Sequence, residues 1–115
     1  MKQGEIWLIN LDPTVGAEIK KTRPAIIVND NALGKLPLKI IVPITDWKES
    51  YEIAPWMTKL EPDKENRLTK ISAADSFQIR SVSQERFVKQ IGTVPEIIMD
   101  EIRIGLAKVL SIDSE

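Results

Sequence analysis

The chain has 115 residues, enough to bury one core, and we expect a single domain over residues 1–115. Its 16 basic and 17 acidic side chains give a formal net charge of −1, so bulk charge neither proposes nor excludes a nucleic-acid partner, and any such site must be a local basic patch. The sequence has no cysteine and no histidine, which excludes disulfides, zinc sites built on these residues, a cysteine nucleophile and the imidazole that usually serves as general base near neutral pH.

The N-terminal half alternates apolar runs with polar loops. Residues 1–5 contain one lysine and no long apolar run follows them, so we expect no signal peptide, no membrane span and a cytoplasmic protein. β-Branched and aromatic side chains predict a strand over residues 5–11, and short apolar runs predict buried strands over 24–28 and 38–44. The first two strands are separated by a polar loop, residues 15–22.

The second half is predicted to contain short strands joined by turns. These strands are expected over residues 53–60, 67–73, 76–81 and 88–92. Pro55 favours an edge or a bulge for the first of them, because proline cannot donate to a sheet ladder. Residues 47–52 form a second loop, residues 61–66 a charged turn, and residues 83–87 one helical turn capped by Ser83.

The C-terminal segment has the pattern of an amphipathic helix. Thr93 and Glu96 have the spacing of a capping box, and Pro95 is tolerated in a first helical turn. Apolar residues then recur at helical spacing, namely Ile98, Ile102, Leu106, Val109 and Leu110. We therefore expect a helix over residues 94–110, packed on a sheet.

These elements predict a β-rich α+β fold of about five to seven mostly antiparallel strands with a terminal helix. Many short strands leave edges that must be covered or paired. A small, partly closed antiparallel barrel is one way to manage them.

Several segments, in this order, closely resemble the MazF/PemK toxin family. They are GEIW (4–7), LDPTVG (11–16), TRPAIIV (22–28), VPIT (42–45), QIRSV (78–82) and VPE (94–96). The resemblance covers nearly the whole chain. It implies an SH3-like barrel with a C-terminal helix, usually as a homodimer, and no metal or cofactor.

The resemblance also implies a function. Members of this family are toxins of type II toxin–antitoxin systems that cleave single-stranded RNA or mRNA at short sequence motifs. Each is neutralised by a cognate antitoxin whose disordered tail lies across the RNA site. RNA supplies its own nucleophile, the 2′-hydroxyl, so the protein has to accept a proton, stabilise the phosphorane and protonate the leaving oxygen.

Arg23 and Thr45 are the expected catalytic residues. A guanidinium is planar and permanently charged, and it can bind two phosphate oxygens at once. Arg23 precedes a buried strand, and the resemblance places the family's catalytic arginine there. Thr45 follows VPI, where the resemblance places a catalytic Thr or Ser; its hydroxyl can bond a phosphate oxygen or orient the 2′-hydroxyl.

The proton acceptor is the open assignment. Ala17 lies about where one branch of the family carries a histidine, and Phe77 lies where members carry Asp or Glu. Asp75 would share a strand face with Phe77 if the strand is regular, so it is the candidate substitute. Asp46 can orient Arg23 or act as base, although an Asp after a strand is also typical of a turn.

The expected RNA-binding residues come from both loops and from QIRSV. Lys20 and Lys21 form a local basic loop with Arg23, and Gly16 can act as its hinge. Asp46, Gln78 and Arg80 are further candidates, and the rings of Trp47, Tyr51 and Trp56 can stack on bases, whereas Trp7 is expected in the core.

Two alternatives remain open at this stage. One is an SH3-like interaction module with a weak or inactive nuclease site, which Ala17 and Phe77 favour and Arg23 and Thr45 oppose. The other is a gyrase-binding toxin like CcdB. Those toxins rely on a C-terminal Trp-Gly-Ile, whereas residues 111–115 read SIDSE, so gyrase binding ranks lower.

Overall fold

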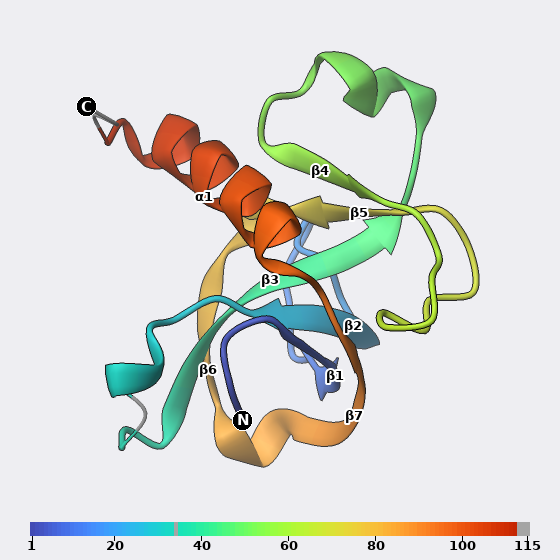
Figure 1. The fold of residues 1–115 in the computed structure, drawn as a ribbon. Helices are drawn as coiled ribbons and strands as arrows, with labels where there is room; N and C mark the ends of the chain where they lie inside the picture. Colours follow the sequence, from blue (N-terminus) through green and yellow to red (C-terminus); the bar gives the residue numbers. More distant parts are fainter. Residues whose placement is uncertain (34, 113–115) are drawn as a thin grey trace.

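Seven strands form one curved antiparallel sheet in the part of the chain that the structure describes (Figure 1). The structure, a computed structural model, describes residues 1–33 and 35–112; residues 113–115 of the C-terminal sequence compared above lie outside it. The strands are β1 (Glu5–Asn10), β2 (Thr22–Ile27), β3 (Leu38–Asp46), β4 (Met57–Leu60), β5 (Ser72–Asp75), β6 (Arg80–Ser83) and β7 (Phe87–Thr93).

The long strand β3 organises the sheet, whose order is β4-β5-β3-β2-β1-β7. Its first residues pair with β6, its centre with β2 and its last residues with β5. Two register irregularities between β1 and β7 mark bulges, which bend a sheet. The sheet curves but does not close completely. The expected fold, a β-rich, partly closed antiparallel barrel with a C-terminal helix, is therefore confirmed.

The central strands are buried on both faces, which explains their continuous apolar runs. One face packs against the C-terminal helix, through a core of Ile6, Ile26, Val42, Ile44, Leu60, Ala74, Val94, Met99 and Ile102. The other face holds a second core of Ile9, Leu11, Ala25, Ile27, Ile41 and Val82. Trp7, expected in the core, is half-buried against this second core and meets Phe87 edge-on at 5.5 Å between ring centroids.

Helix α1 (Glu96–Leu110) crosses one side of the sheet beside β4 (Figure 1). The expected capping box is wrong: Pro95 occupies the cap position, with no side-chain cap bond, and Thr93 is the last residue of β7. The backbone N–H of Thr93 donates to the carbonyl of Glu65 (2.9 Å), which keeps this residue extended. The helix therefore begins two residues later than expected.

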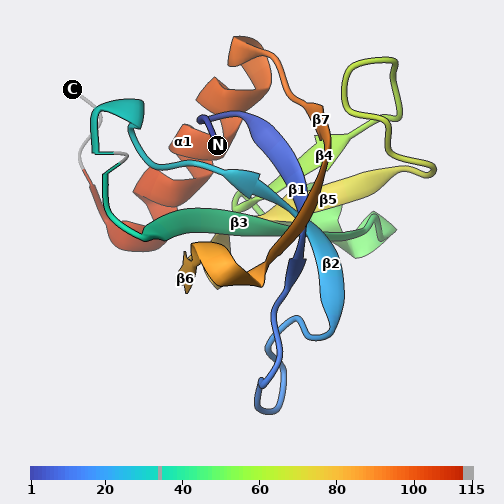
Figure 2. The same cartoon turned by 90° about the horizontal axis from the view of Figure 1, so that it is seen from below.

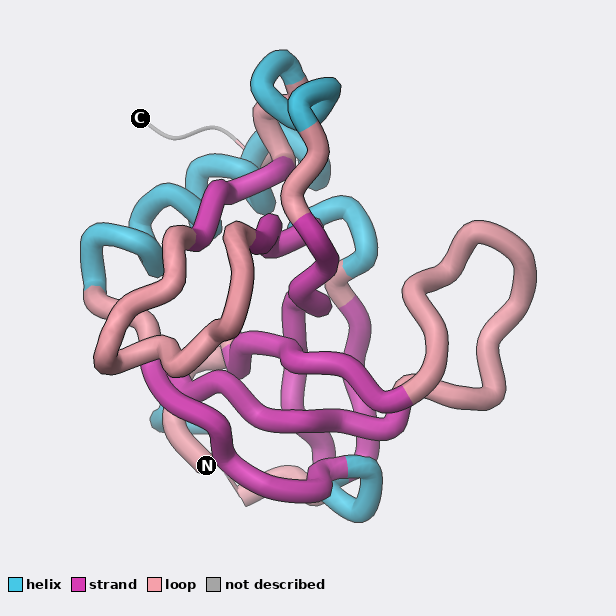
Figure 3. Tube along the Cα trace, turned by 90° about the vertical axis from the view of Figure 1, so that its right-hand side faces the viewer, coloured by secondary structure: helices cyan, strands magenta, loops and turns pink. Residues whose placement is uncertain are grey.

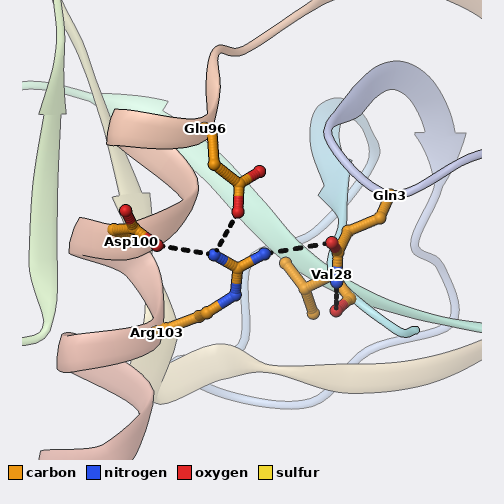
Figure 4. Close-up of polar contacts among 5 residues, drawn as sticks. All are labelled: Gln3, Val28, Glu96, Asp100 and Arg103. Carbon is orange, nitrogen blue, oxygen red and sulfur yellow. Dashed lines mark hydrogen bonds and ion pairs between the residues drawn. The ribbon is translucent and has the colours of Figure 1, made fainter. Parts of the chain in front are cut away.

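Arg103 ties α1 to the start of the chain. Its Nη1 donates to Glu96 and to Asp100 (2.7 Å each), and its Nη2 donates to Gln3 Oε1 (3.0 Å). Gln3 in turn donates to the carbonyl of Val28 (2.9 Å), so the network reaches the end of β2 (Figure 4). The carboxylate of Glu96, expected in a capping box, pairs with this guanidinium instead.

Three expected strands in the second half are shorter than the sequence suggested. Residues 49–53 form a 3-10 turn, η2 (Glu49–Ile53), and Pro55 lies between that turn and β4. Arg67 has a left-handed φ of 55°, which no strand residue adopts, so β5 begins only at Ser72. A second 3-10 turn, η3 (Ser76–Gln78), interrupts the expected strand over residues 76–81.

The helical turn expected over residues 83–87 is confirmed. The 3-10 turn η4 (Gln84–Arg86) is capped by Ser83, whose Oγ accepts from the N–H of Glu85 (3.2 Å). One further 3-10 turn, η1 (Asn31–Leu33), precedes β3. Among the described residues, no helix is long and apolar enough to cross a membrane.

Candidate active site

Arg23 and Thr45 lie together in a groove of about 150 Å³. Arg23 is the second residue of β2 and Thr45 lies near the end of β3; both side chains are half-buried. The register pairs Ala25 with Pro43, so the next residues of the same face, two positions out on each strand, are Arg23 and Thr45. Strand pairing thus brings together two residues that are 22 positions apart in the sequence.

The other wall of this groove comes from the loop between β4 and β5. Leu68, Thr69 and Lys70 line the groove, together with Ser72 at the start of β5. Nothing in the sequence pattern pointed to Lys70, because the wall forms only when this loop folds back towards β2. Lys70 adds a cation beside Arg23 and pairs with Asp46, with 3.2 Å between Nζ and Oδ2.

The loop between β4 and β5, residues 61–71, is called the wall loop below, and it is held from two sides. The buried side chain of Asn66 donates to the carbonyl of Glu61 (2.8 Å) and accepts from the N–H groups of Asp63 and Leu68 (3.0 and 2.9 Å). Strand β7 presses against the same loop at Gly92, where an added Cβ would lie 2.3 Å from the carbonyl oxygen of Glu65. These contacts hold the wall loop in place as one wall of the groove.

The two candidate carboxylates occupy different environments. Asp46 is exposed at the rim of the groove, where it faces Lys70. Asp75 is buried, caps η3 by accepting from the N–H of Phe77 (3.0 Å), and does not line the groove. Burial raises the pKa of Asp75 against the lowering effect of its backbone hydrogen bonds. The expectation that Asp75 and Phe77 share a strand face is wrong, because η3 turns the chain between them.

A larger hollow of about 470 Å³ adjoins the groove along β3. Its lining mixes polar and apolar residues and includes Pro43, whose neighbours Ile44 and Thr45 line the groove. Phe77 stands at this hollow with 64% of its surface exposed, and its ring meets that of Trp56 edge-on at 5.9 Å. A hollow with an exposed aromatic ring can hold a flat, partly polar group.

The third wall of the site is the loop between β1 and β2, which extends clear of the sheet (Figures 2 and 3). Ala17, Glu18 and Ile19 of this loop line the larger hollow, and Lys20 and Lys21 are exposed. Gly16 has a φ of +59°, and a Cβ added there would have no atom within 4 Å, so this part of the loop is open to solvent.

Gln78 and Arg80, expected to bind RNA, also hold this loop. Gln78 bonds the backbone of Ala17 and Ile19, and Arg80 Nη1 donates to the carbonyl of Leu11 (3.1 Å). Arg86 donates to the carbonyls of Asn10 (3.1 Å) and Asp12, a role that the sequence pattern did not indicate. The base of the loop is thus fixed by two arginines from the β6–β7 region.

Trp47 and Tyr51 lie beside the site and not in it. Their rings meet edge-on at 5.8 Å, and Lys59 Nζ lies 5.1 Å from the centre of the Trp47 ring. Neither aromatic residue lines the groove or the larger hollow. Among the described residues, no three carboxylate side chains gather in a way that suits a metal ion, so we name no metal ligands.

Comparison with known proteins gives a consistent result. A family model described as "PemK-like, MazF-like toxin of type II toxin-antitoxin system" matches residues 2–110. The Endoribonuclease PemK of Escherichia coli is 34% identical over 113 residues, which cover 96% of this chain and 83% of the relative. The Endoribonuclease MazF9 of Mycobacterium tuberculosis is 30% identical over 100 residues, covering 82% of each chain.

Solved structures share the fold at lower identity. A MazF from Deinococcus radiodurans superposes with a TM-score of 0.80 at 23% identity, covering 96% of both chains. An endoribonuclease from a mycobacterial species, solved in complex with its cognate antitoxin, gives a TM-score of 0.74 at 18% identity, covering 100% of this chain and 99% of that one.

Proposed function

Because the chain belongs to the PemK-like, MazF-like family of type II toxin–antitoxin toxins, we propose that it is an endoribonuclease that cleaves single-stranded RNA. Relatives that align along most of this chain are named endoribonucleases. The observation that carries the proposal is that Arg23 and Thr45 line one groove, open to a substrate strand.

The groove supplies groups for each step of the reaction. The 2′-oxygen attacks the phosphorus and the bond to the 5′-oxygen breaks, which leaves a 2′,3′-cyclic phosphate and a 5′-hydroxyl. Arg23 binds the phosphorane oxygens, where charge develops, and the hydroxyl of Thr45 orients the 2′-hydroxyl. No step requires a metal ion.

The proton transfers are assigned to the rim of the groove. Asp46 lines the groove and Asp75 does not, so Asp46 is the better candidate to accept the 2′-proton. Lys70, 3.2 Å from Asp46, is the ammonium donor for the leaving 5′-oxygen. Asp46 was already a candidate base from the sequence, whereas the role of Lys70 follows only from its place in the lining of the groove.

The larger hollow adjoins the groove on the side of Pro43, so it is placed to take a base next to the cleaved phosphate. The exposed ring of Phe77, supported by Trp56, offers a stacking surface for that base. Base contacts of this kind are how a short RNA sequence motif would be selected. Lys20 and Lys21 would contact neighbouring phosphates.

Three further assignments accompany this function. We propose a cognate antitoxin as the protein partner, because an endoribonuclease of the same fold has been solved in complex with one. We propose a homodimer, since Leu36, just before β3, and Leu38 and Ile40, within it, expose apolar side chains that a second copy would cover. The site of action of an mRNA-cleaving toxin is the cytoplasm.

Cleavage of a single-stranded RNA of mixed sequence in the presence of EDTA tests the nuclease proposal. We expect cyclic-phosphate ends from the wild type. Loss of one transition-state donor costs roughly 10²- to 10³-fold in rate, so Arg23→Ala should lose most cleavage. Arg23→Lys keeps the charge but not the bidentate geometry and should recover little of it.

Lys108→Ala, an exposed lysine of α1 remote from the groove, is the matched control and should cleave like the wild type. An absence of cleavage on RNAs that cover varied sequences would instead favour the SH3-like binding module. Cleavage that EDTA abolishes would contradict the metal-independent mechanism.

A further inference from the structure

Gln78 uses both ends of its side-chain amide on the loop between β1 and β2. Its Oε1 accepts from the backbone N–H of Ile19 at 2.6 Å, and its Nε2 donates to the carbonyl of Ala17 at 3.2 Å. The two partners are 59 and 61 residues away in the sequence. One side chain of η3 thus holds two alternate residues of the loop, which fixes the local path of the backbone between them.

The segment directly after Ile19 touches the proposed catalytic arginine. The carbonyl of Lys20 accepts from Arg23 Nε at 3.3 Å. The next residue, Lys21, has a φ of 70° and is fixed on its far side, because its N–H donates to Asp12 Oδ1 (3.1 Å) and its carbonyl accepts from the N–H of Leu11 (2.9 Å). The Lys20 carbonyl shares its peptide group with the N–H of Lys21, so Asp12 anchors it on one side, and Gln78 holds the chain on the other side at Ile19.

Arg23 is oriented by this carbonyl. A guanidinium that donates through Nε to the backbone keeps its two terminal nitrogens for another partner, and their direction is set by the first bond. The described hydrogen bonds of Arg23 include the one to Lys20 and none to a carboxylate. Movement of the Lys20 carbonyl would therefore turn the guanidinium relative to Thr45.

We propose that Gln78 is a positioning residue for Arg23, acting through the backbone of residues 17–20. The proposal rests on the proposed nuclease function for its catalytic consequence, but the structural link stands on its own. Arg80 and Arg86 hold the stem of the loop, at Leu11, Asn10 and Asp12. Loss of Gln78 would consequently release residues 17–19 and leave the Lys20 carbonyl held from the Lys21 side alone, while the stem of the loop stays attached.

Direct contact between Gln78 and RNA is the competing role, and double substitution separates the two. Gln78→Met keeps the length of the side chain and removes both hydrogen bonds. Gln84→Met is the matched control, because Gln84 also donates from its amide to a loop carbonyl, that of Leu36 (3.1 Å), on a segment that does not touch Arg23.

The structural link is tested without RNA. In Gln78→Met the amide of Ile19 should exchange with deuterium roughly 5-fold faster or more, because a net hydrogen bond has been lost. The Nε–H resonance of Arg23, observed by nitrogen-edited NMR, should shift and broaden. Gln84→Met should change neither. An unchanged Arg23 signal alongside faster Ile19 exchange would overturn the positioning role.

The catalytic consequence is tested with cleavable RNA. Misplacement of Arg23 should lower kcat by roughly 10-fold or more with little change in KM, since misplacement of a reacting group by an ångström can cost on the order of 10²-fold. In an Arg23→Lys background, Gln78→Met should have little further effect. An equal loss in both backgrounds would show that Gln78 contacts RNA directly and overturn the proposal. If the wild type does not cleave RNA, the nuclease function fails, while the exchange and NMR results still decide the structural link.

Discussion

A guanidinium and a hydroxyl lie in one groove because Arg23 and Thr45 occupy matching places at the ends of β2 and β3. Each is half-buried, so each is held by the sheet while its polar end reaches the groove. Rigid strand ends are a favourable place for groups that must be aligned with a phosphate. The roles of both residues can be tested by changes that remove one polar group and keep the shape.

Thr45→Val removes the hydroxyl and keeps the branched shape. We expect the rate of RNA cleavage to fall roughly 10²-fold, because the substrate hydroxyl loses its positioned partner. Thr45→Ser, which keeps the hydroxyl, should retain most of the rate. Single-turnover cleavage measures both variants, and an undiminished rate in Thr45→Val would remove Thr45 from the mechanism.

Asp75 provides a residue-scale prediction about stability. Burial raises its pKa above the ordinary value of 3.8, so the folded protein binds this proton more tightly than the unfolded chain does. The stabilising effect of the protonated form is fully present below pH 3.8, and it is lost as the pH rises through the pKa of Asp75 in the folded protein. Asp75→Asn still accepts from Phe77 and removes this titration.

We therefore expect the wild type to lose stability relative to Asp75→Asn as the pH rises above the ordinary pKa of an aspartate. Urea midpoints of both proteins, measured from acidic to neutral pH, give the comparison. Two curves that run parallel over this range would contradict the effect of burial. Cleavage by Asp75→Asn should stay near the wild-type rate, since Asp75 does not line the groove.

At the scale of elements, the position of the wall loop depends on β7. Gly92 brings this strand so close to Glu65 and Asn66 that a Cβ would lie 2.3 to 2.8 Å from their backbone atoms. Backbone atoms cannot move aside as a flexible side chain can. The same loop carries Lys70 into the groove, so packing at Gly92 and geometry at Arg23 are connected through residues 61–71.

Gly92→Ala should lower the free energy of unfolding by about 1–3 kcal/mol, the usual cost of forcing extra volume into a packed site. It should also lower the cleavage rate, because the wall loop has to shift. Thr93→Ala, a change of an exposed side chain at the next position, is expected to stay within about 0.5 kcal/mol of the wild type. Chemical denaturation measures both, and a neutral Gly92→Ala would show that the loop adapts.

Elements with strong local signals were predictable from the sequence, and those set by tertiary contacts were not. The apolar runs of β2 and β3 and the apolar spacing of α1 reflect burial directly. By contrast, the 3-10 turn at residues 76–78 depends on Asp75 as a cap, and the start of α1 depends on the bond from Thr93 to Glu65. A capping-box pattern cannot show that its threonine is already committed to a strand.

The site as a whole is assembled from segments that are far apart in the sequence. Arg23 and Thr45 lie within the recognisable segments TRPAIIV and VPIT, so their importance was predictable from the sequence. Lys70 and Arg86 are not marked by any motif, because the first acts through a loop that folds back and the second through carbonyls of a distant loop. The same holds for the two hydrogen bonds from Gln78 to the loop between β1 and β2, which form only because η3 lies beside that loop.

At the scale of the molecule, a protein of net charge −1 has to bind RNA through a local cluster of cations. Lys20 and Lys21 are exposed on the loop between β1 and β2, which extends from the sheet (Figure 2). Arg23 and Lys70 line the groove. The acidic side chains elsewhere contribute little at a distance once salt screens them. Affinity for RNA should therefore depend steeply on salt, and the dependence should trace back to these residues.

For single strands, the logarithm of the binding constant falls with the logarithm of salt concentration with a slope of about −0.7 per neutralised phosphate. Replacing Lys20 and Lys21 by alanine should flatten this slope by about 1.4 if each lysine contacts one phosphate. The measurement is fluorescence anisotropy with an RNA whose 2′-hydroxyls are methylated, so that it binds without being cut. The matched control replaces Lys89 and Lys108, two exposed lysines of β7 and α1, and should leave the slope unchanged. Equal flattening in both double variants would mean that RNA responds to net charge alone, because a localised basic loop requires the two pairs to differ.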